Sequence, residues 1–467
     1  MSRFAGSDRK ALAGLEAGIL GMARSGFAAA ALCLREGARP ICLDLERPAG
    51  EESRLAELEA AGARMIWGPH PSELLGRLGA IVKSPGVPGE IGFLAEARRR
   101  GIPIWSEVEL AARCARGPIL GITGTNGKST TTAWAADLLR SCGFQHELCG
   151  NIGRPISDAV LHAEEGSILV TEISSFQLED VAAFRPQGAA LLNFTPDHLD
   201  RHPDLASYRE AKMRIFENQS DDQHAVLGEQ DDLAEEVRRR FRSRILRFRL
   251  ADRGEEGAFA RDGRLGIRLG GKETILCPEG ELSLPGPHNR ANALAALAIV
   301  APLGPSPDGL VASLTTFSGL PHRLERVATI GSVLYVNDSK ATNTDSLSVA
   351  LEAFDAPLIL LAGGRDKGQD FRPLADRVRK RCRKVLLFGE SAASIRRQWG
   401  PDLCEELGEM AAAVDRAHAL AGPGEIVLLS PACASFDQFA NYEQRGDRFR
   451  ELVRGLESSG AAGKEKG

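Results

Sequence analysis

The sequence predicts an α/β fold in three domains, with a Rossmann-like domain at each end of the chain and a P-loop-containing domain between them. Short apolar segments alternate with helical stretches through most of the chain, which indicates βαβ units and parallel sheets. The length of 467 residues corresponds to two to four domains at roughly 100–200 residues each. Fifty glycines beside only three tyrosines are typical of a chain with many tight turns between strands and helices.

Composition and charge exclude several classes of protein. Lys and Arg number 58 and Asp and Glu 63, which gives a net charge of −5 and argues against a nucleic-acid partner. No apolar run approaches the ~18 residues of a membrane helix, so we expect no membrane insertion. The nine cysteines include no Cys-x-x-Cys pair, which favours reduced thiols. We therefore expect a cytoplasmic protein, acting as a monomer.

The first predicted domain spans residues 1–116. Four strands are expected at 15–20, 40–44, 80–83 and 102–105, with helices at 27–36, 51–61 and 91–100 between them. The turn from Gly21 to Gly26 approximates a dinucleotide-binding fingerprint, with Ala23 in place of the second glycine, and Asp44 ends the next strand. This pattern indicates a nucleotide site of a modified type more than bound NAD.

The second predicted domain, residues 117–319, opens on the strongest motif of the chain. An apolar strand at 119–123 runs into Gly124-Thr125-Asn126-Gly127-Lys128-Ser129-Thr130 and then into a helix that continues through Leu139. Such glycines let backbone N–H groups surround phosphate oxygens at the start of a helix. Lys128 would then reach the β- and γ-phosphates, and Ser129 would hold Mg²⁺. Although Ile122 replaces the first glycine of the usual pattern, the order of strand, loop and helix favours a P-loop ATPase-like domain over an incidental turn.

Three further segments of this domain carry ionisable side chains. Glu172 follows an apolar strand at 168–170 and is either a metal ligand beside the phosphate loop or a solvated loop acid. The segment from Asn193 to His202 is either a capped helix start or a second Mg²⁺ site with His198 as a ligand. Lys212 lies on an amphipathic helical stretch at 208–216, and this pattern alone predicts a surface residue.

A basic run from Arg238 to Arg249 offers two interpretations. It could bind RNA, or it could be the end of a charged helix followed by an alternating strand at 244–249 whose arginine face lies in water. Because the run stands alone in an acidic chain, we favour the second interpretation.

The third predicted domain, residues 320–467, has strands expected at 334–337, 358–362, 385–388 and 426–429. Polar segments from Asn337 to Asn343 and from Gly363 to Gly368 follow two of these strands, where open α/β sheets place their ligands. Cys433 has no base near it in the sequence, and we interpret it as a buried thiol and not as a nucleophile. Residues from Gly455 onward are predicted to be a frayed tail.

Taken together, these motifs resemble those of the Mur ligase family. The resemblance covers nearly the whole chain, and its segments follow in order: Thr123–Ser129, Gly150–Gly153, Glu172–Leu178, Asp197–Arg201, His288–Asn292, Gly319–Glu325 and Asn337–Asn343. Two C-terminal segments, Ser430–Phe439 and Asn441–Gly446, resemble one member in particular, which joins D-glutamate to UDP-N-acetylmuramoyl-L-alanine. The resemblance implies an ATP-dependent amide ligase of peptidoglycan synthesis that works through an acyl phosphate and uses two Mg²⁺ ions.

The resemblance also implies roles for individual residues. It makes Lys128, Glu172, His198, Lys212 and Lys340 catalytic, with Ser129, Glu172, His198 and a carbamylated Lys212 around the Mg²⁺ ions. It assigns ATP to residues 124–130 together with Asn289, Asn292, Arg323 and Asp338. The resemblance assigns the binding of the UDP-sugar to Ser25, Asp44, Ser84 and Asn151. It assigns the binding of D-glutamate to Lys340, Thr342, Lys367, Ser435, Phe436 and Tyr442.

The sequence departs from the family pattern at two places, and two other functions stay open. Leu45-Glu46 follows Asp44 where the family often has Thr-Arg, and Tyr442 stands where the close relative has Phe. A ligase for another amino acid, or one like folylpolyglutamate synthase, would share the ATP motifs. A non-enzymatic nucleotide-binding regulator would not need Glu172, His198, Lys212 and Lys340 together.

Overall fold

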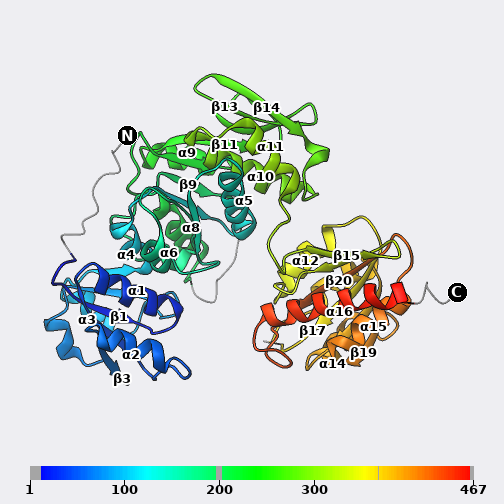
Figure 1. Ribbon diagram of the computed structural model, residues 1–467, viewed down its shortest axis with the longest axis horizontal. Helices are drawn as coiled ribbons and strands as arrows, with labels where there is room; N and C mark the ends of the chain where they lie inside the picture. The colour runs from blue at the N-terminus through cyan, green and yellow to red at the C-terminus, as the bar shows by residue number, and fades with distance from the viewer. Residues whose placement is uncertain (1–11, 196–201, 367, 463–467) are drawn as a thin grey trace. The chain divides into compact units, whose positions relative to one another are not determined.

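The computed structural model describes residues 12–195, 202–366 and 368–462. The chain divides into two compact units, one formed by residues 1–283 with 287–317 and the other by residues 284–286 with 318–467. The α/β class is confirmed, because helices alternate with the strands of three sheets (Figure 1). Within the described ranges, no helix is long and apolar enough to cross a membrane.

The first sheet, in the first unit, has five parallel strands in the order β3-β2-β1-β4-β5. The strands are β1 (Glu16–Leu20), β2 (Arg39–Asp44), β3 (Arg64–Trp67), β4 (Ala80–Lys83) and β5 (Ile104–Ser106), and the helical segments are α1 (Arg24–Arg35), α2 (Glu52–Ala60), η2 (Ser72–Gly76), α3 (Gly92–Arg99) and α4 (Glu107–Cys114). The strand order reverses direction between β1 and β4, which is where a doubly wound sheet binds its ligand.

The second sheet of this unit has nine strands in the order β14-β13-β12-β11-β10-β9-β6-β8-β7. They are β6 (Ile119–Thr123), β7 (His146–Gly150), β8 (Ile168–Glu172), β9 (Gly188–Leu191), β10 (His224–Leu227), β11 (Arg244–Arg249), β12 (Gly257–Arg261), β13 (Arg264–Leu269) and β14 (Lys272–Pro278). Pairing is parallel from β7 through β12, whereas β12, β13 and β14 form an antiparallel meander.

The helical segments of the second sheet lie between its strands or follow the last of them (Figure 1). They are α5 (Lys128–Ser141), α6 (Ile156–His162), α7 (Ser175–Leu178), α8 (Leu205–Met213), η3 (Arg214–Phe216), α9 (Asp231–Arg240), η4 (Glu279–Glu281), α10 (Pro287–Val300), η5 (Ala301–Leu303) and α11 (Pro307–Thr316). Helices α5 and α10 pack against each other. This packing brings α10 beside the helix that follows the glycine-rich loop.

The third sheet forms the second unit and has the order β15-β16-β20-β17-β18-β19. The strands are β15 (Glu325–Ile330), β16 (Val333–Asn337), β17 (Leu358–Gly363), β18 (Cys382–Phe388), β19 (Cys404–Gly408) and β20 (Ile426–Ala432), and the helical segments are α12 (Thr344–Glu352), η6 (Arg372–Leu374), α13 (Ala375–Arg381), α14 (Ala392–Trp399), α15 (Met410–Leu420) and α16 (Tyr442–Ala462). Only β15, at the edge, pairs antiparallel among these strands.

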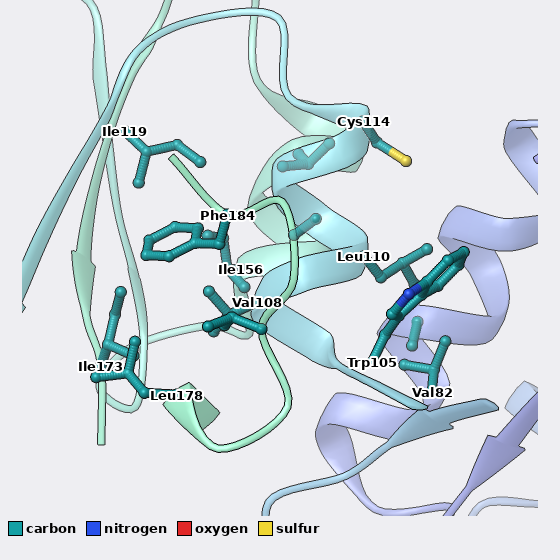
Figure 2. Close-up of a cluster of buried hydrophobic side chains, with 14 of the residues drawn as sticks. Val82, Trp105, Val108, Leu110, Cys114, Ile119, Ile156, Ile173, Leu178 and Phe184 are labelled. Atoms are coloured by element: carbon teal, nitrogen blue, oxygen red, sulfur yellow. The ribbon is translucent and has the colours of Figure 1, made fainter. Parts of the chain in front are cut away.

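Helix α4 joins the hydrophobic cores of the first two sheets. Val82 and Trp105 from the first sheet and Phe184 from the segment before β9 belong to one buried cluster with Val108 and Leu110 of α4 (Figure 2). A fully buried side chain of this size contributes about 1.5–3 kcal/mol. The shared core therefore holds the two sheets of the first unit together.

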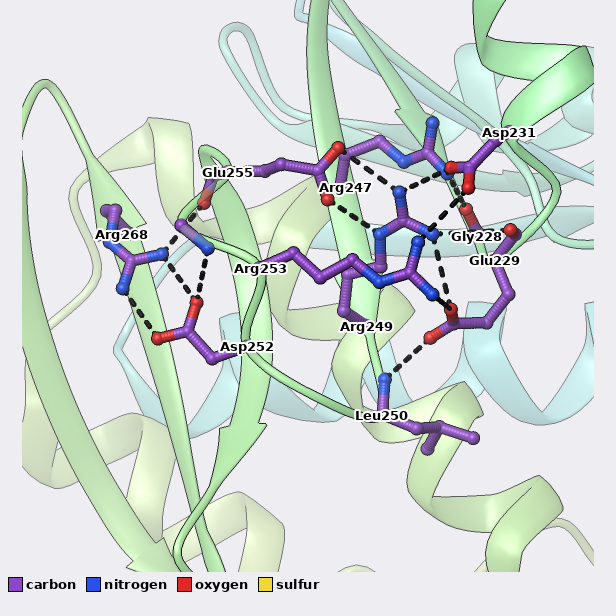
Figure 3. Close-up of polar contacts among 11 residues, drawn as sticks. Gly228, Glu229, Asp231, Arg247, Arg249, Leu250, Asp252, Arg253, Glu255 and Arg268 are labelled. Carbon is purple, nitrogen blue, oxygen red and sulfur yellow. Dashed lines mark hydrogen bonds and ion pairs between the residues drawn. The ribbon is translucent and has the colours of Figure 1, made fainter.

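The prediction that the arginine face of the strand at 244–249 lies in water is wrong. Residues 244–249 do form a strand, β11, but Arg247 and Arg249 are only 4% and 3% exposed. Arg247 Nη2 lies 2.9 Å from Asp231 Oδ1, and Arg249 Nε lies 2.7 Å from Glu255 Oε2 (Figure 3). These acidic partners come from the start of α9 and from the connection to β12, so their proximity depends on the tertiary fold.

Two expectations for the C-terminal region have different outcomes. The frayed tail is wrong for residues 455–462, because α16 runs from Tyr442 to Ala462; residues 463–467 lie outside the described ranges. The interpretation of Cys433 is confirmed, since its side chain is fully buried. Burial raises the pKa of this thiol to about 11, which keeps it protonated and unreactive at neutral pH.

Candidate functional site

The glycine-rich loop, residues 124–127, connects β6 to the start of α5. Gly124 and Gly127 have φ angles of +152° and +81°, which side chains with a Cβ rarely adopt. A Cβ at Gly127 would also lie 2.3 Å from Asn292 Oδ1. Thr131 Oγ1 donates to that same oxygen at 3.3 Å. Asn292, on α10, is thus packed directly against the loop, as a residue that contacts a loop-bound ligand would be.

Asn193 holds the opposite side of the loop. The backbone N–H of Asn126 donates to Asn193 Oδ1 at 2.8 Å, and Asn193 Nδ2 donates to the Asn126 carbonyl at 3.0 Å. Thr125 Oγ1 bonds the Thr195 carbonyl at 3.1 Å. Asn193 was not among the predicted site residues. The available signal was its position two residues beyond β9, the strand that pairs with β6.

Two lysines converge on one carbonyl of the loop. Lys128 Nζ donates to Gly124 O at 2.9 Å and to Thr125 O at 2.8 Å. Lys212 Nζ, from α8, donates to the same Gly124 O at 2.8 Å. Lys128 therefore brings a cation to the loop, which suits a polyanionic ligand, and Lys212 brings a second amine nitrogen to the same carbonyl.

The prediction that Lys212 lies on the surface is wrong. Its side chain is 1% exposed, and its ammonium lies 4.6 Å from the centre of the Tyr208 ring. Tyr208 and Met213 of the same helix are fully buried. Helix α8 therefore presents its lysine face to the glycine-rich loop, a contact between segments 88 residues apart that helical periodicity does not reveal.

Glu172 ends β8 and lies beside the end of β6, in register with Ile122. Its side chain is 2% exposed, which excludes the solvated loop acid. Oε1 accepts a hydrogen bond from Asn151 Nδ2 at 2.7 Å, whereas Oε2 is buried and has no hydrogen-bond partner among the described residues. A buried carboxylate oxygen without a donor is costly unless a cation joins it, so this atom fits a hard divalent metal such as Mg²⁺.

The remaining metal candidates of this region have different placements. Ser129 is 3% exposed and lies in the first turn of α5. His198 lies outside the described residues. The neighbouring His202 is buried, stacks on Phe176 and has Nε2 at 2.9 Å from Ser175 Oγ. No group of three His, Cys, Asp or Glu side chains that could hold a metal occurs in the described parts of the chain.

The predicted UDP-sugar residues of the first sheet gather at the reversal between β1 and β4. Asp44 accepts hydrogen bonds from the backbone N–H groups of Met22 at 2.6 Å and Leu45 at 2.7 Å. Ser84 Oγ donates to Gly21 O at 2.7 Å. These bonds fix the turn between β1 and α1. Ser25, in the first turn of α1, interacts with the buried Glu107, whose pKa burial raises to about 7.

The second unit brings a separate set of predicted residues together. Asp338 is buried, and this burial raises its pKa to about 7 although Ser430 donates to its carboxylate at 2.9 Å. Lys340 Nζ lies 5.3 Å from the centre of the Tyr442 ring. Ser435 is 2% exposed, whereas the next side chain, Phe436, is 58% exposed.

The other predicted residues lie on several different elements. Arg323 belongs to the loop that precedes β15, and Thr342 is half-buried in the segment that precedes α12. Asn289 lies one turn before Asn292 on α10, and Thr130 follows Ser129 in α5. Lys367 lies outside the described residues.

Comparison with known proteins gives one family over most of the chain. The Mur ligase middle domain matches residues 122–300, and the Mur ligase glutamate ligase domain matches residues 322–433. A UDP-N-acetylmuramoylalanine--D-glutamate ligase of Anaeromyxobacter dehalogenans is 43% identical over 469 aligned residues, which cover 95% of this chain and 98% of that protein. The ligase of the same name from Myxococcus xanthus is 42% identical and covers 96% of this chain and 99% of that protein.

Solved structures share the fold at low sequence identity. UDP-N-acetylmuramate-alanine ligase of Thermotoga maritima has a TM-score of 0.55 and 18% identity, covering 95% of this chain and all of that one. MurF of Acinetobacter baumannii has a TM-score of 0.59 and 16% identity, covering 88% and 91%. The family domains, the full-length relatives and the three-sheet architecture agree, and the chain belongs to the Mur ligase family.

Proposed function

We propose that this protein is an ATP-dependent ligase that joins D-glutamate to UDP-N-acetylmuramoyl-L-alanine in peptidoglycan precursor synthesis. The observation that carries the proposal is the convergence of Lys128 and Lys212 on Gly124, beside the buried carboxylate of Glu172. The names of the full-length relatives support the choice of substrates. The nine free cysteines fit a cytoplasmic protein, and we propose that it acts as a monomer.

Each predicted domain takes one substrate in this proposal. Residues 1–116 bind the UDP-sugar through Ser25, Asp44 and Ser84, with Asn151 of the next domain. Residues 117–319 bind ATP through positions 124–130, Asn289 and Asn292, and residues 320–467 bind D-glutamate. Arg323 and Asp338 belong to the last range but serve the nucleotide. The D-glutamate residues are Lys340, Thr342, Lys367, Ser435, Phe436 and Tyr442.

The ATP site works through the backbone of the glycine-rich loop. The N–H groups at the start of α5 would provide donors and positive potential for phosphate oxygens. The N–H groups of Thr125 and Asn126 instead donate to Asn193 and hold the loop in place. Lys128, which bonds two loop carbonyls at 2.8 and 2.9 Å, is close enough to exchange these bonds for phosphate oxygens. The close packing of Asn292 on Gly127 supports a role for the Asn292 amide in binding the nucleotide.

Two Mg²⁺ sites are proposed beside this loop. Ser129 and the unpartnered Oε2 of Glu172 would hold one ion, and His198 with a carbamylated Lys212 the other. Carbamylation converts the amine to an anion with two carboxylate oxygens, the kind of ligand that Mg²⁺ prefers. The ions would supply charge neutralisation for the phosphates and the substrate carboxylate.

The reaction follows from what each bond requires. An oxygen of the substrate carboxylate attacks the γ-phosphorus of ATP, which forms an acyl phosphate and releases ADP. The neutral amine of D-glutamate then attacks the acyl carbon, the tetrahedral intermediate expels inorganic phosphate, and the amine proton is lost. Lys128 and Lys340 would stabilise the negative charge that develops in these steps. A carboxylate without this activation has no adequate leaving group.

An amino-acid panel tests the proposed function. Phosphate release is measured with ATP, Mg²⁺ and UDP-N-acetylmuramoyl-L-alanine, to which D-glutamate, L-glutamate or L-lysine is added. Of the three amino acids, we expect only D-glutamate to cause phosphate release. The matched Lys128→Ala variant, which lacks the loop cation, should release none. Release that depends on another amino acid would make the protein a different amide ligase. No release with any of the three would favour a nucleotide-binding regulator.

Gly127→Ala tests whether the loop binds the nucleotide. The new Cβ would meet Asn292 Oδ1 at 2.3 Å, so loop and helix α10 must separate. We expect the affinity for a non-hydrolysable ATP analogue to fall about tenfold or more by calorimetry, equivalent to at least ~1.4 kcal/mol.

The matched control is Gly143→Ala, at the other end of α5. Gly143 has a similar φ of +77°, but nothing lies within 4 Å of its Cβ position. This variant should lose about 1 kcal/mol of stability and keep its nucleotide affinity. Equal affinities of the two variants would contradict the proposed site.

Lys212→Ala tests the carbamate. If the missing group is an anion, the variant should be inactive in phosphate release and should regain part of its activity with added formate or acetate. Lys272→Ala, on the exposed end of β14, is the control and should remain active. Thermal melting establishes that the Lys212 variant is folded. Recovery with methylamine in place of the carboxylates would show that the amine itself is required.

A further inference from the structure

Arg445 is a fully buried charge in the second unit, and neither the proposed mechanism nor the predicted site uses it. It lies in the first turn of α16, three residues after Tyr442, and its side chain is 0% exposed. Burial lowers the pKa of its guanidinium to about 10, yet the group stays charged at neutral pH. No carboxylate of the described residues lies within ion-pair distance of it. A cation in such a place requires strong compensation from hydrogen bonds.

The compensation comes from two separate loops. Arg445 Nε donates to Ser339 Oγ at 3.0 Å and Nη2 to Ser339 O at 2.8 Å. Nη1 donates to Cys433 O at 3.0 Å. The planar guanidinium thus joins the loop after β16 to the loop after β20 with donors in fixed directions, which a lysine cannot reproduce.

Both loops carry predicted substrate residues next to the bonded atoms. Ser339 lies between Asp338 and Lys340, and its Oγ donates to Tyr442 O at 2.8 Å. Cys433 precedes Ala434 and Ser435. Ala434 in turn exchanges backbone hydrogen bonds with Arg365, at 2.9 and 3.1 Å, in the loop after β17. Arg445 therefore sets the relative positions of two strand ends, and the backbone of Ala434 holds the third beside them.

We propose that Arg445 is a positioning residue for the amino-acid substrate, because it fixes the spacing of Lys340, Ser435 and Tyr442 through Ser339 and Cys433. The inference rests on the proposed function of this unit. It does not require Arg445 to touch the substrate, since Nε, Nη1 and Nη2 each donate to a loop atom. Side chains that bind a small dicarboxylate must be held within a fraction of an ångström to keep their affinity.

Arg445→Lys tests the inference through the separate KM values of D-glutamate and UDP-N-acetylmuramoyl-L-alanine. We expect the KM for D-glutamate to rise about tenfold or more, because the lysine keeps the charge but loses the two-loop geometry. The KM for UDP-N-acetylmuramoyl-L-alanine should stay within about twofold of wild type, because its proposed residues lie in the other unit. A general loss of folded protein would lower the amount of active enzyme without separating these two values.

Arg448→Lys is the matched control, one turn along the same helix, where the side chain is 51% exposed and pairs with Glu451. It should leave both KM values unchanged. If Arg445→Lys does not fold, Ser339→Ala tests the inference in its place. This variant removes the Oγ that links Arg445 to Tyr442. The KM for D-glutamate should then rise about threefold or more. Folded variants with wild-type KM for D-glutamate would overturn the inference. A wild-type protein inactive with D-glutamate would instead contradict the proposed function.

Discussion

The structure of the first unit depends on how the backbone of four residues, 124–127, is held. A glycine-rich loop presents N–H groups to a ligand only if its carbonyls are satisfied elsewhere. Here the Gly124 carbonyl accepts from Lys128 and from Lys212, and Asn126 is bonded on both sides by Asn193. The loop is therefore fixed by β9, α8 and α10 and does not rely on its own sequence alone.

Several buried charged groups likewise depend on hydrogen-bond partners from distant parts of the chain. Lys212, Glu172 and Arg445 each cost free energy when removed from water, and each has hydrogen-bond partners in a different part of the chain. For Glu172, one oxygen is paired and the other is not. Arg247 and Arg249 differ, because their acidic partners lie at the protein surface. These two arginines hold β11 to the start of α9.

The sequence predicted those strands of the parallel sheets that are buried apolar runs ending at glycine or proline turns, but not β7, β10 or β19. Strands β4 and β6 have the predicted bounds. The meander from β12 to β14 was missed because its segments are short, partly exposed and rich in Arg, Glu and Gly. β3 was missed for the same reason, as its four residues begin with Arg64 and none is fully buried.

Long charged side chains account for the wrong predictions within the elements. Lys212 lies where a helical pattern predicts solvent, and its partner is 88 residues away. Arg249 lies where an alternating pattern predicts solvent, and the fold of α9 and of the connection to β12 brings its acidic partners to it. The glycine-rich loop could be found because all its parts are contiguous in sequence. The roles of Asn193 and Arg445 could not be derived in this way, since they depend on contacts with segments 67 and 106 residues away. For Asn193 the sequence offers only its position just after β9.

The central claim is that the substrate carboxylate is activated by phosphoryl transfer from ATP. The most direct measurement uses UDP-N-acetylmuramoyl-L-alanine with ¹⁸O in the alanine carboxylate and follows the label into released phosphate by mass spectrometry. An acyl phosphate must pass one labelled oxygen to each phosphate when the amide forms, because the bond between that oxygen and the acyl carbon is the one that breaks. Phosphate without the label, at a rate that matches product formation, would contradict the account.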